Sequence, residues 1–216
     1  MGDYHETWSQ SYFGTYYYFP ASVGILGGNG DVYVSAINPV AGFSDVPSSY
    51  WAYFYITAVV TKGFMFGCGG GNFCPTALAD RKMMADYITV AMRQIQSSAA
   101  FNAYFDDVSN DAWAPFINRA RELGITSGCG TRTFCPNSII TRAQVAVFII
   151  RGMGQTPSTA PFSAYFDDIA NDSLAPYINR MKELNITSGC GVRAYCPNNN
   201  LQKDEMTVLL YRAFPN

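Results

Sequence analysis

The sequence predicts a mainly α protein made of three helix-loop-helix repeats, preceded by a short β-hairpin-like arm. Three observations lead to this fold class. The six cysteines form three pairs with identical internal spacing, and the first members of successive pairs, at positions 68, 129 and 190, lie 61 residues apart. Apolar residues recur at helical spacing on both sides of each pair. Residues 1–41 share neither feature and are rich in Tyr, Phe and Gly.

The composition is that of a globular chain with a substantial core. Of 216 residues, 49% are hydrophobic and 14% are charged, and the net charge is −2. These values exclude a disordered chain and argue against a nucleic-acid binder. The longest apolar runs, such as residues 145–150, fall far below the roughly 18 residues that a membrane span needs, so no membrane span is expected. The N-terminus is acidic where a signal peptide is basic, and we expect any export signal to have been removed or replaced.

The repeat unit is best preserved in its second and third copies. The stretch 104–107 (Tyr-Phe-Asp-Asp) returns at 165–168. The first copy is more diverged but keeps Phe43 and Arg81. The chain is therefore divided into an arm, residues 1–41, and three repeats that form one domain, residues 42–98, 99–155 and 156–216.

The first helix of a repeat is expected just after the Asp-rich stretch. In the second copy, apolar residues recur at helical spacing from Trp113 to Leu123. Asp111 is the expected N-cap, and Pro115 falls in the first turn, where its missing N–H costs little.

The second helix follows the cysteine loop and is more apolar. In the second copy Thr141 and Gln144 form a capping box, and the helix runs to about Gly152. Two helices this short cannot bury both apolar faces alone, so the three repeats must pack on one another. We expect a pseudo-threefold body with the second helices in a central three-helix bundle and the first helices outside.

The arm is expected to form one hairpin. Residues 23–26 and 31–34 indicate two short strands joined by a Gly-Gly-Asn-Gly turn at 27–30. Because an isolated hairpin is marginally stable, we expect it to lie against the repeats or to pair with a partner chain.

The cysteine pairs are expected to form one disulfide inside each repeat, in an oxidising compartment. Five residues separate the members of a pair, which fits no common zinc spacing, and the single histidine, His5, lies outside the repeats. No metal and no cofactor are expected. Calcium stays an open alternative at the Asp-rich stretches 106–111 and 167–172, although Asp111 and Asp172 are better explained as helix caps. The expected pairs are Cys68 with Cys74, Cys129 with Cys135, and Cys190 with Cys196.

The order of motifs resembles the S-layer homology repeat. From residue 105 to residue 152 the second copy shows Phe-x-Asp-Val, Trp-Ala, an apolar helix, Gly-Ile-x-x-Gly, Phe-x-Pro, Thr-Arg-Ala-Gln and a second apolar helix. Over residues 42–216 the resemblance implies a prism-shaped domain of three repeats. It also implies docking on envelope polysaccharide, often through an acidic, pyruvate-bearing sugar held in grooves between repeats.

The resemblance further implies which side chains line these grooves. The Arg of the Thr-Arg-Ala element is the family's main ligand contact, supported by the Asp and Trp near the repeat start and by the Gly that closes the first helix. The third copy departs from this pattern, with Leu174 for Trp, Asn185 for Gly and Lys203 for Arg. Arg142 is therefore expected to contribute most to binding and Lys203 least. The implied groove residues are Arg81, Arg142, Asp45, Asp107, Trp51, Trp113, Gly63 and Gly124, with Lys203 at the third position.

Each of these assignments has a structural alternative. An Arg in the first turn of a helix lies near unpaired N–H groups and can hold a carboxylate through two parallel hydrogen bonds, but it can also brace a neighbouring loop. Trp51 and Trp113 can stack on sugar rings, whereas their spacing among apolar neighbours favours the core.

The motifs argue against an enzyme. The sequence has no Gly-x-Ser-x-Gly, no phosphate loop and no nucleophile beside His5. We expect a non-enzymatic, extracellular protein of the bacterial cell surface that attaches to envelope polysaccharide. The alternative is a self-assembling subunit of a surface layer or filament, with residues 1–41 making the subunit contacts. The 15 Phe, 15 Tyr and 3 Trp residues, in a chain of low charge, favour such protein contacts.

Overall fold

The computed structural model describes residues 42–215 and four short strands of the arm; residues 1–10, 13–14, 17–22, 25–32, 35–41 and 216 are not described. The chain divides into two units, Met1–Ala41 and Gly42–Asn216.

The described part of the arm consists of two antiparallel strand pairs. β1 (Ser11–Tyr12) pairs with β2 (Thr15–Tyr16), and β3 (Val23–Gly24) pairs with β4 (Tyr33–Val34). The second pair falls within the two strands predicted from the sequence, whereas the first pair has no counterpart in the prediction. The predicted turn at 27–30 lies outside the described residues.

Six α-helices form the regular structure of the described part of the second unit, which confirms the mainly α prediction. The predicted borders between repeats, after residues 98 and 155, remain predictions. Short 3-10 turns at Asp106–Val108 and Asp167–Ile169 open the second and third copies. The helices are α1 (Tyr53–Thr61), α2 (Arg81–Ala91), α3 (Ala114–Glu122), α4 (Arg142–Gly152), α5 (Ala175–Glu183) and α6 (Lys203–Ala213).

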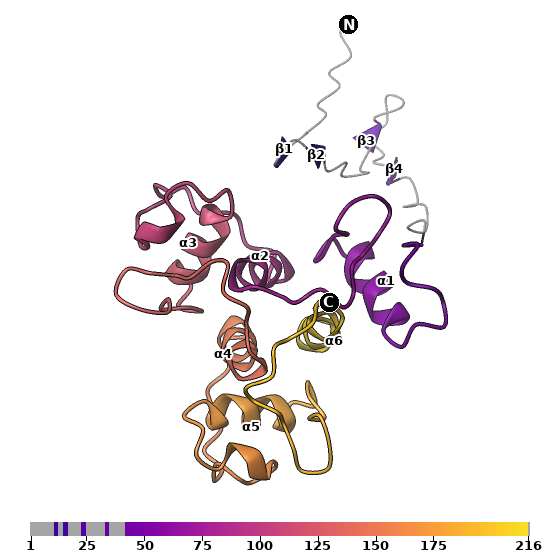
Figure 1. The fold of residues 1–216 in the computed structure, drawn as a ribbon. Helices are drawn as coiled ribbons and strands as arrows, with labels where there is room; N and C mark the ends of the chain where they lie inside the picture. The colour runs from indigo at the N-terminus through magenta and orange to yellow at the C-terminus, as the bar shows by residue number, and fades with distance from the viewer. Residues whose placement is uncertain (1–10, 13–14, 17–22, 25–32, 35–41, 216) are drawn as a thin grey trace, which may run out of the picture. The chain divides into compact units, whose positions relative to one another are not determined.

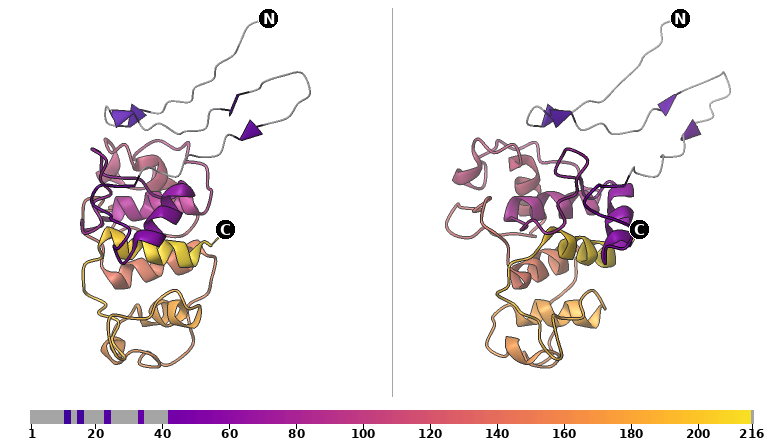
Figure 2. Two further views of the ribbon diagram at one scale, coloured as in Figure 1. Left: turned by 90° about the vertical axis from the view of Figure 1, so that its right-hand side faces the viewer. Right: turned by 45° about the vertical axis from the view of Figure 1, so that its right-hand side comes forward.

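The main helix contacts join different repeats. α3 packs on α2, α5 packs on α4, and α1 packs on α6. In Figure 1, α2, α4 and α6 lie around the centre of this unit, and α1, α3 and α5 lie outside them, one in each of three lobes. The turned views in Figure 2 keep α6, in yellow, between the lobes of α1 and α5. Each outer helix thus covers the central helix of the preceding copy, and the last copy is covered by the first.

Backbone hydrogen bonds also link the three copies in a closed circle, just before the central helices begin. The N–H of Ala79 donates to the carbonyl of Leu201, that of Leu201 to Ile140, and that of Ile140 back to Ala79, at 2.9, 3.0 and 2.9 Å. All three residues are fully buried. Each copy therefore supplies one donor and one acceptor that only its neighbours can satisfy.

The central helices begin with the caps that their sequences suggest. Thr141 and Gln144 form the predicted capping box of α4, and Asp80 caps α2 by accepting from the N–H of Met83. The prediction for the outer helix is wrong in one detail. Asp111 is not the N-cap of α3 but accepts from the N–H of Trp113 in the turn before the helix, and Asp172 does the same for Leu174.

The links between repeats are fastened to the outer helix that follows them. Asn118 of α3 is fully buried and donates from Nδ2 to the carbonyl of Ala100, while Glu122 accepts from the hydroxyl of Ser97. The third copy repeats this arrangement with Asn179, Pro161, Glu183 and Ser158. These links hold their repeats in place rather than acting as free spacers.

The three predicted disulfides are present, each within one repeat. The second cysteine of each pair adopts a left-handed backbone conformation, with φ between 57° and 59°. The glycine before each first cysteine has no room for a side chain; a Cβ on Gly128 would lie 2.3 Å from the carbonyl oxygen of Thr133. Among the described helices, none combines the length and apolar character needed to cross a membrane.

Candidate functional site

One cation is buried at each junction between repeats. Arg81, Arg142 and Lys203 are the first residues of α2, α4 and α6, and they are 6%, 8% and 3% exposed. Each cation reaches into the cysteine loop of the next copy, and Lys203 reaches into that of the first. Each of these cations therefore makes its contacts with a copy other than its own.

Arg81 forms the junction between the first and second copies. Its Nε donates to the carbonyl of Phe134 at 2.8 Å, and its guanidinium lies 4.9 Å from the centre of the Phe134 ring. The Nη2 atom is buried and has no hydrogen-bond partner. Burial lowers the pKa of Arg81, an effect that the charge of Asp107 opposes. This junction thus holds a desolvated cation with an unsatisfied donor.

Arg142 forms the equivalent junction between the second and third copies but is paired. Its Nε donates to the carbonyl of Tyr195 at 3.0 Å, and its guanidinium lies 5.1 Å from the Tyr195 ring. Its Nη1 also makes a 2.9 Å ion pair with Oε1 of Glu205 on α6. An internal carboxylate therefore already neutralises this cation.

Lys203 joins the third copy to the first. Its Nζ donates to the carbonyls of Phe66 and Phe73, at 2.6 and 2.9 Å, and lies 4.2 Å from the Phe73 ring. Burial lowers the pKa of Lys203 to about 8, an effect that Asp45 opposes. Two backbone carbonyls thus hold the ammonium group inside the junction.

The N–H groups at the start of the central helices are occupied. In α2 the N–H of Arg81 donates to the carbonyl of Ser138, and that of Lys82 to the carbonyl of Pro136. The same bonds recur at the starts of α4 and α6. The sequence-based suggestion that unpaired N–H groups lie beside these cations is therefore wrong, because the loop of the next copy satisfies them.

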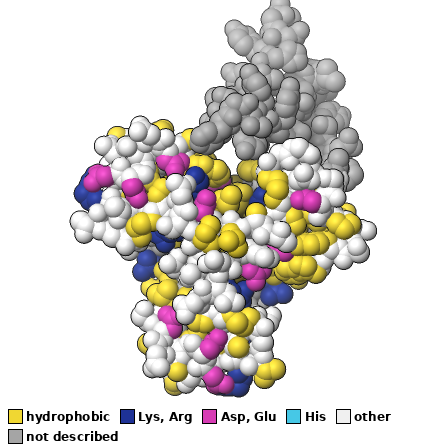
Figure 3. Space-filling model, viewed as in Figure 1, with side chains coloured by type: hydrophobic (Ala, Val, Ile, Leu, Met, Phe, Trp, Pro, Cys, Tyr) yellow, Lys and Arg dark blue, Asp and Glu magenta, His cyan; other side chains and the backbone are white. Residues whose placement is uncertain are grey.

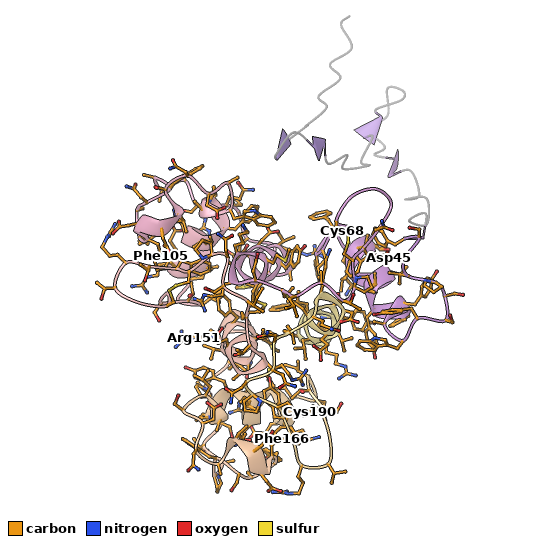
Figure 4. All side chains as sticks on the ribbon, in the orientation of Figure 1. Asp45, Cys68, Phe105, Arg151, Phe166 and Cys190 are labelled. Atoms are coloured by element: carbon orange, nitrogen blue, oxygen red, sulfur yellow. A yellow bond between two sulfur atoms is a disulfide. The ribbon has the colours of Figure 1, made fainter. Side chains whose placement is uncertain are left out.

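The Asp that recurs near the start of each copy braces the cysteine loop of that copy. Asp107 accepts from the N–H groups of Phe134 and Cys135, at 2.8 and 2.7 Å. Asp45 and Asp168 make the same pair of bonds in the other two loops. Figure 4 shows Asp45 and Cys68 in one lobe, that of α1. Both oxygens of each carboxylate face the loop, so these residues support the site by shaping it.

The two tryptophans and the two glycines differ in their surroundings. Trp51 is 59% exposed, contrary to the core packing that its spacing favours, whereas Trp113 is half-buried against the core. Gly63 and Gly124 both end their helices at a φ of 71°, and a Cβ on either would meet no atom within 4 Å. Asn185 takes the same left-handed conformation at 57°, so the third copy keeps the turn without the glycine.

Two features of the junctions are not apparent from the repeat pattern. The rings beneath the cations, Phe134, Tyr195 and Phe73, precede the second cysteine of each pair and were not assigned a role by the sequence. Glu205 was also missed, although an acidic residue in the first turn of the last helix is a usable signal.

The carboxylates of the Asp-rich stretch 106–111 each have an internal partner. Asp106 pairs with Arg132, Asp107 binds loop N–H groups, and Asp111 accepts from a backbone N–H. Among the described residues, one group could place three metal-ligating atoms together: Asp168, Cys190 and Cys196. Its two sulfurs form a disulfide, so this group is not a metal site.

These observations define a domain of interlocked tandem repeats with a buried cation at each junction. The S-layer homology domain model matches residues 42–82 and 104–146. The chain therefore carries S-layer homology repeats, and the third copy, with the same cysteine spacing and helix packing, extends them. It is a cell-surface protein of this family.

Several curated proteins are similar to this chain. S-layer protein EA1 of Bacillus anthracis is 26% identical over 174 residues, which cover 78% of this chain and 20% of that protein. An endoglucanase of Bacillus sp. (strain KSM-635) is 27% identical over 133 residues, covering 61% of this chain and 14% of the enzyme. An uncharacterized cell wall amidase of B. anthracis is 34% identical over 102 residues, covering 47% and 19%. The chain thus spans a fifth or less of the length of these relatives.

Proposed function

We propose that this chain attaches to the cell envelope by binding an acidic polysaccharide in the groove between its first two repeats. The observation that carries the proposal is Arg81, whose Nη2 has no hydrogen-bond partner and which lies at the contact between the first and second copies, close enough to Asp107 for that carboxylate to act on its pKa. The resemblance implies Asp107, Trp113 and Gly124 of the second copy as the other groove residues. A guanidinium with a free donor can grip a sugar carboxylate through two parallel bonds. A pyruvate-bearing sugar supplies such a carboxylate.

The remaining groove residues of the second copy have different roles in this proposal. Asp107 shapes the loop, and the half-buried Trp113 offers a partly free ring on which a sugar can pack. Gly124 keeps the end of α3 free of side chain.

The three junctions are not equivalent in this proposal. Arg142 is already paired with Glu205, and the third copy has Leu174 and Asn185 where the repeat pattern has Trp and Gly, so we rank Arg142 below Arg81. Lys203 lacks the planar fork of arginine, and backbone carbonyls already hold its ammonium. By the repeat pattern, the implied groove residues of the first copy, Asp45, Trp51 and Gly63, would serve this third junction, and Asp45 acts on the pKa of Lys203.

Co-sedimentation with cell-wall sacculi tests the proposal. Sacculi that carry their polysaccharide are compared with sacculi stripped of it by hydrofluoric acid. Arg81→Ala should lose on the order of 2–3 kcal/mol of binding free energy, because one charged bidentate contact disappears. Arg142→Ala is the matched control and should lose much less. Equal binding to both kinds of sacculi would show that polysaccharide is not the ligand.

Two of the relatives are enzymes, and they share only a small part of their length with this chain. An endoglucanase and an amidase match it over less than a fifth of their lengths, which supports attachment as the role of the shared repeats. We propose a non-enzymatic role for the chain on this ground.

Self-assembly is the second candidate function. Trp51 and Phe54, at 59% and 62% exposed, place large apolar side chains on the surface of the α1 lobe. In Figure 3 charged side chains are scattered over the visible face, with no large patch of one sign to oppose association. Removal of residues 1–41 tests whether the arm makes subunit contacts. A folded but smaller assembly, measured by light scattering, would support this function, and an unchanged monomer before and after removal would exclude it.

A further inference from the structure

The outer helix of the first copy differs from the other two outer helices in its charge. α3 carries the ion pair Arg119–Glu122 at 2.9 Å, and α5 carries its counterpart. α1 contains no charged residue, and apart from two threonines all of its side chains are aromatic or aliphatic. A helix that is apolar all round is normally buried on every side. Trp51, just before α1, and Phe54, within it, are nevertheless 59% and 62% exposed.

The exposed side of α1 corresponds to the side on which α3 and α5 hold the links between repeats. The side chains of α3 that fasten the preceding link are an amide, a guanidinium and a carboxylate, from Asn118, Arg119 and Glu122. α5 repeats these contacts. The corresponding positions of α1 are Thr57, Ala58 and Thr61. These residues supply none of the three groups, and the hydroxyl of Thr61 donates to the carbonyl of Thr57 within the helix.

This side of α1 is large at one end and small at the other. Trp51 and Phe54 lie toward its N-terminal end, and Thr57, Ala58 and Thr61 follow within two turns; these five residues are called the α1 face below. Positions three or four apart share one side of a helix. When two such helices run antiparallel about a two-fold axis, the rings of each copy lie on the small side chains of the other. The α1 face is therefore complementary to itself.

The cations beside the α1 face are engaged within their own chain. Nζ of Lys62 donates to the carbonyl of Pro215 and lies 5.3 Å from the centre of the Tyr211 ring. Arg212 donates from Nη1 to the carbonyl of Ile186 at 3.2 Å. An antiparallel pair also keeps the two copies of Lys62 at opposite ends of the contact. A second copy brought against this face thus meets little like-charge repulsion.

We propose that the α1 face is the surface through which two copies of this chain pair, with their α1 helices antiparallel about a two-fold axis. The proposal rests on self-assembly, the second candidate function above, and names a surface for it. Two exposed rings per chain cover less area than a permanent dimer buries, which is about 1,200–2,000 Å² in total. The pairing is therefore reversible and depends on protein concentration.

Opposite charges placed on the α1 face test this arrangement. Phe54→Glu and Thr57→Lys change exposed side chains, and circular dichroism checks that both variants keep their helices. Trp51 is left intact because it is also an implied groove residue. Phe101→Glu, which alters a ring that is 43% exposed outside α1, is the matched control. Sedimentation velocity of the full chain, from low to high protein concentration, measures the dimer.

The wild type and Phe101→Glu should form dimers whose share rises with concentration. Phe54→Glu and Thr57→Lys, each alone, should dimerise at least about tenfold more weakly, because pairing would bury a charge without a partner. An equimolar mixture of these two variants should recover the dimer, since the antiparallel arrangement sets the new carboxylate against the new ammonium group.

Other outcomes overturn the inference in distinguishable ways. If Phe54→Glu associates like the wild type, the α1 face is not the contact, and self-assembly through another surface stands. If the mixture does not recover the dimer, the antiparallel pairing is wrong. If the wild type stays monomeric at every concentration, the pairing and the self-assembly function both fail, whereas polysaccharide binding is untouched. If Phe54→Glu then also lowers binding to sacculi, the α1 face serves the envelope polysaccharide instead of a second copy.

Discussion

The phenol of Tyr50 donates a 2.6 Å hydrogen bond to Oδ2 of Asp204, a residue 154 positions further along the chain. Asp204 is the second residue of α6 and is 2% exposed. Partial burial and the neighbouring Asp204 carboxylate raise the pKa of Tyr50 to about 12, so the phenol stays a donor throughout the physiological range. This bond fastens the first copy to the last.

Tyr50→Phe should therefore destabilise the domain by about 1–3 kcal/mol, because it leaves a buried carboxylate oxygen without this donor. Urea unfolding followed by circular dichroism measures the change. Tyr104→Phe is the control: that hydroxyl lies 3.5 Å from Glu122 at an exposed site, and its loss should have little effect. Equal stability of Tyr50→Phe and the wild type would show that this hydrogen bond does not help to hold the first copy against the third.

Replacing each of two adjacent aspartates with alanine should change the stability of the domain by very different amounts. Asp107→Ala deletes the acceptor of two loop N–H groups and should cost about 2–4 kcal/mol, as expected for charge-assisted bonds that leave unpaired donors behind. Asp106→Ala removes a fully exposed ion pair with Arg132, and its effect should be close to zero at physiological salt. Thermal unfolding of the two variants gives the comparison. A larger effect at Asp106 would contradict the bracing role of Asp107.

The disulfide of the second copy should stabilise its loop mainly by restricting the unfolded chain. Replacing Cys129 and Cys135 together with Ser should lower the free energy of unfolding by about 2.4 kcal/mol, the chain-entropy value for so short a loop. Urea titration under non-reducing conditions measures this loss. The wild type titrated in reductant should show the combined loss of all three bonds, and an unchanged midpoint in both experiments would oppose this account.

Asp86 of α2 should be a destabilising residue at alkaline pH. It is 5% exposed, and burial raises the pKa of its carboxyl to about 8. The other copies place Val147 and Val208 at this position. Asp86→Val should stabilise the domain above pH 8 by about 1–3 kcal/mol, since it removes a buried charge.

The sign of the pH dependence follows from the direction of that shift. Between the ordinary value near 4 and a pKa of about 8, the folded chain binds the proton that the unfolded chain has released. The contribution of Asp86 to stability is therefore lost as the pH rises through this window. Urea midpoints of the wild type and Asp86→Val, measured from pH 5 to pH 9, should diverge with rising pH. Parallel curves would mean that Asp86 does not titrate in this range.

The repeat pattern predicts the helices and disulfides because both depend on residues close together in the sequence. It could not predict which helices pack together. The apolar face of α3 fits α4 of its own copy or α2 of the preceding one equally well by spacing, and tertiary packing decides between them. The caps of α2 and α4 were predictable for the same local reason.

The candidate site was predictable only in its residue types. The Arg, Asp, Trp and Gly positions follow from the resemblance, but their assignment to junctions depends on the packing of one copy against the next. Arg142 and Glu205 pair although they lie 63 positions apart. This separation differs from the repeat period, so the repeat pattern alone does not predict the pair. The occupied N–H groups at Arg81 were missed for a similar reason, because their acceptors lie in another copy.

The circle of hydrogen bonds through Ala79, Ile140 and Leu201 also bears on how such domains are inherited. A duplication that added a single copy, or a deletion that removed one, would leave a donor and an acceptor unmatched and an outer helix with nothing to cover. Solenoids whose repeats stack in a line can grow one unit at a time. Here the triplet is the smallest segment in which all three donors and all three acceptors are matched, so only transfer of the whole triplet keeps these hydrogen bonds intact.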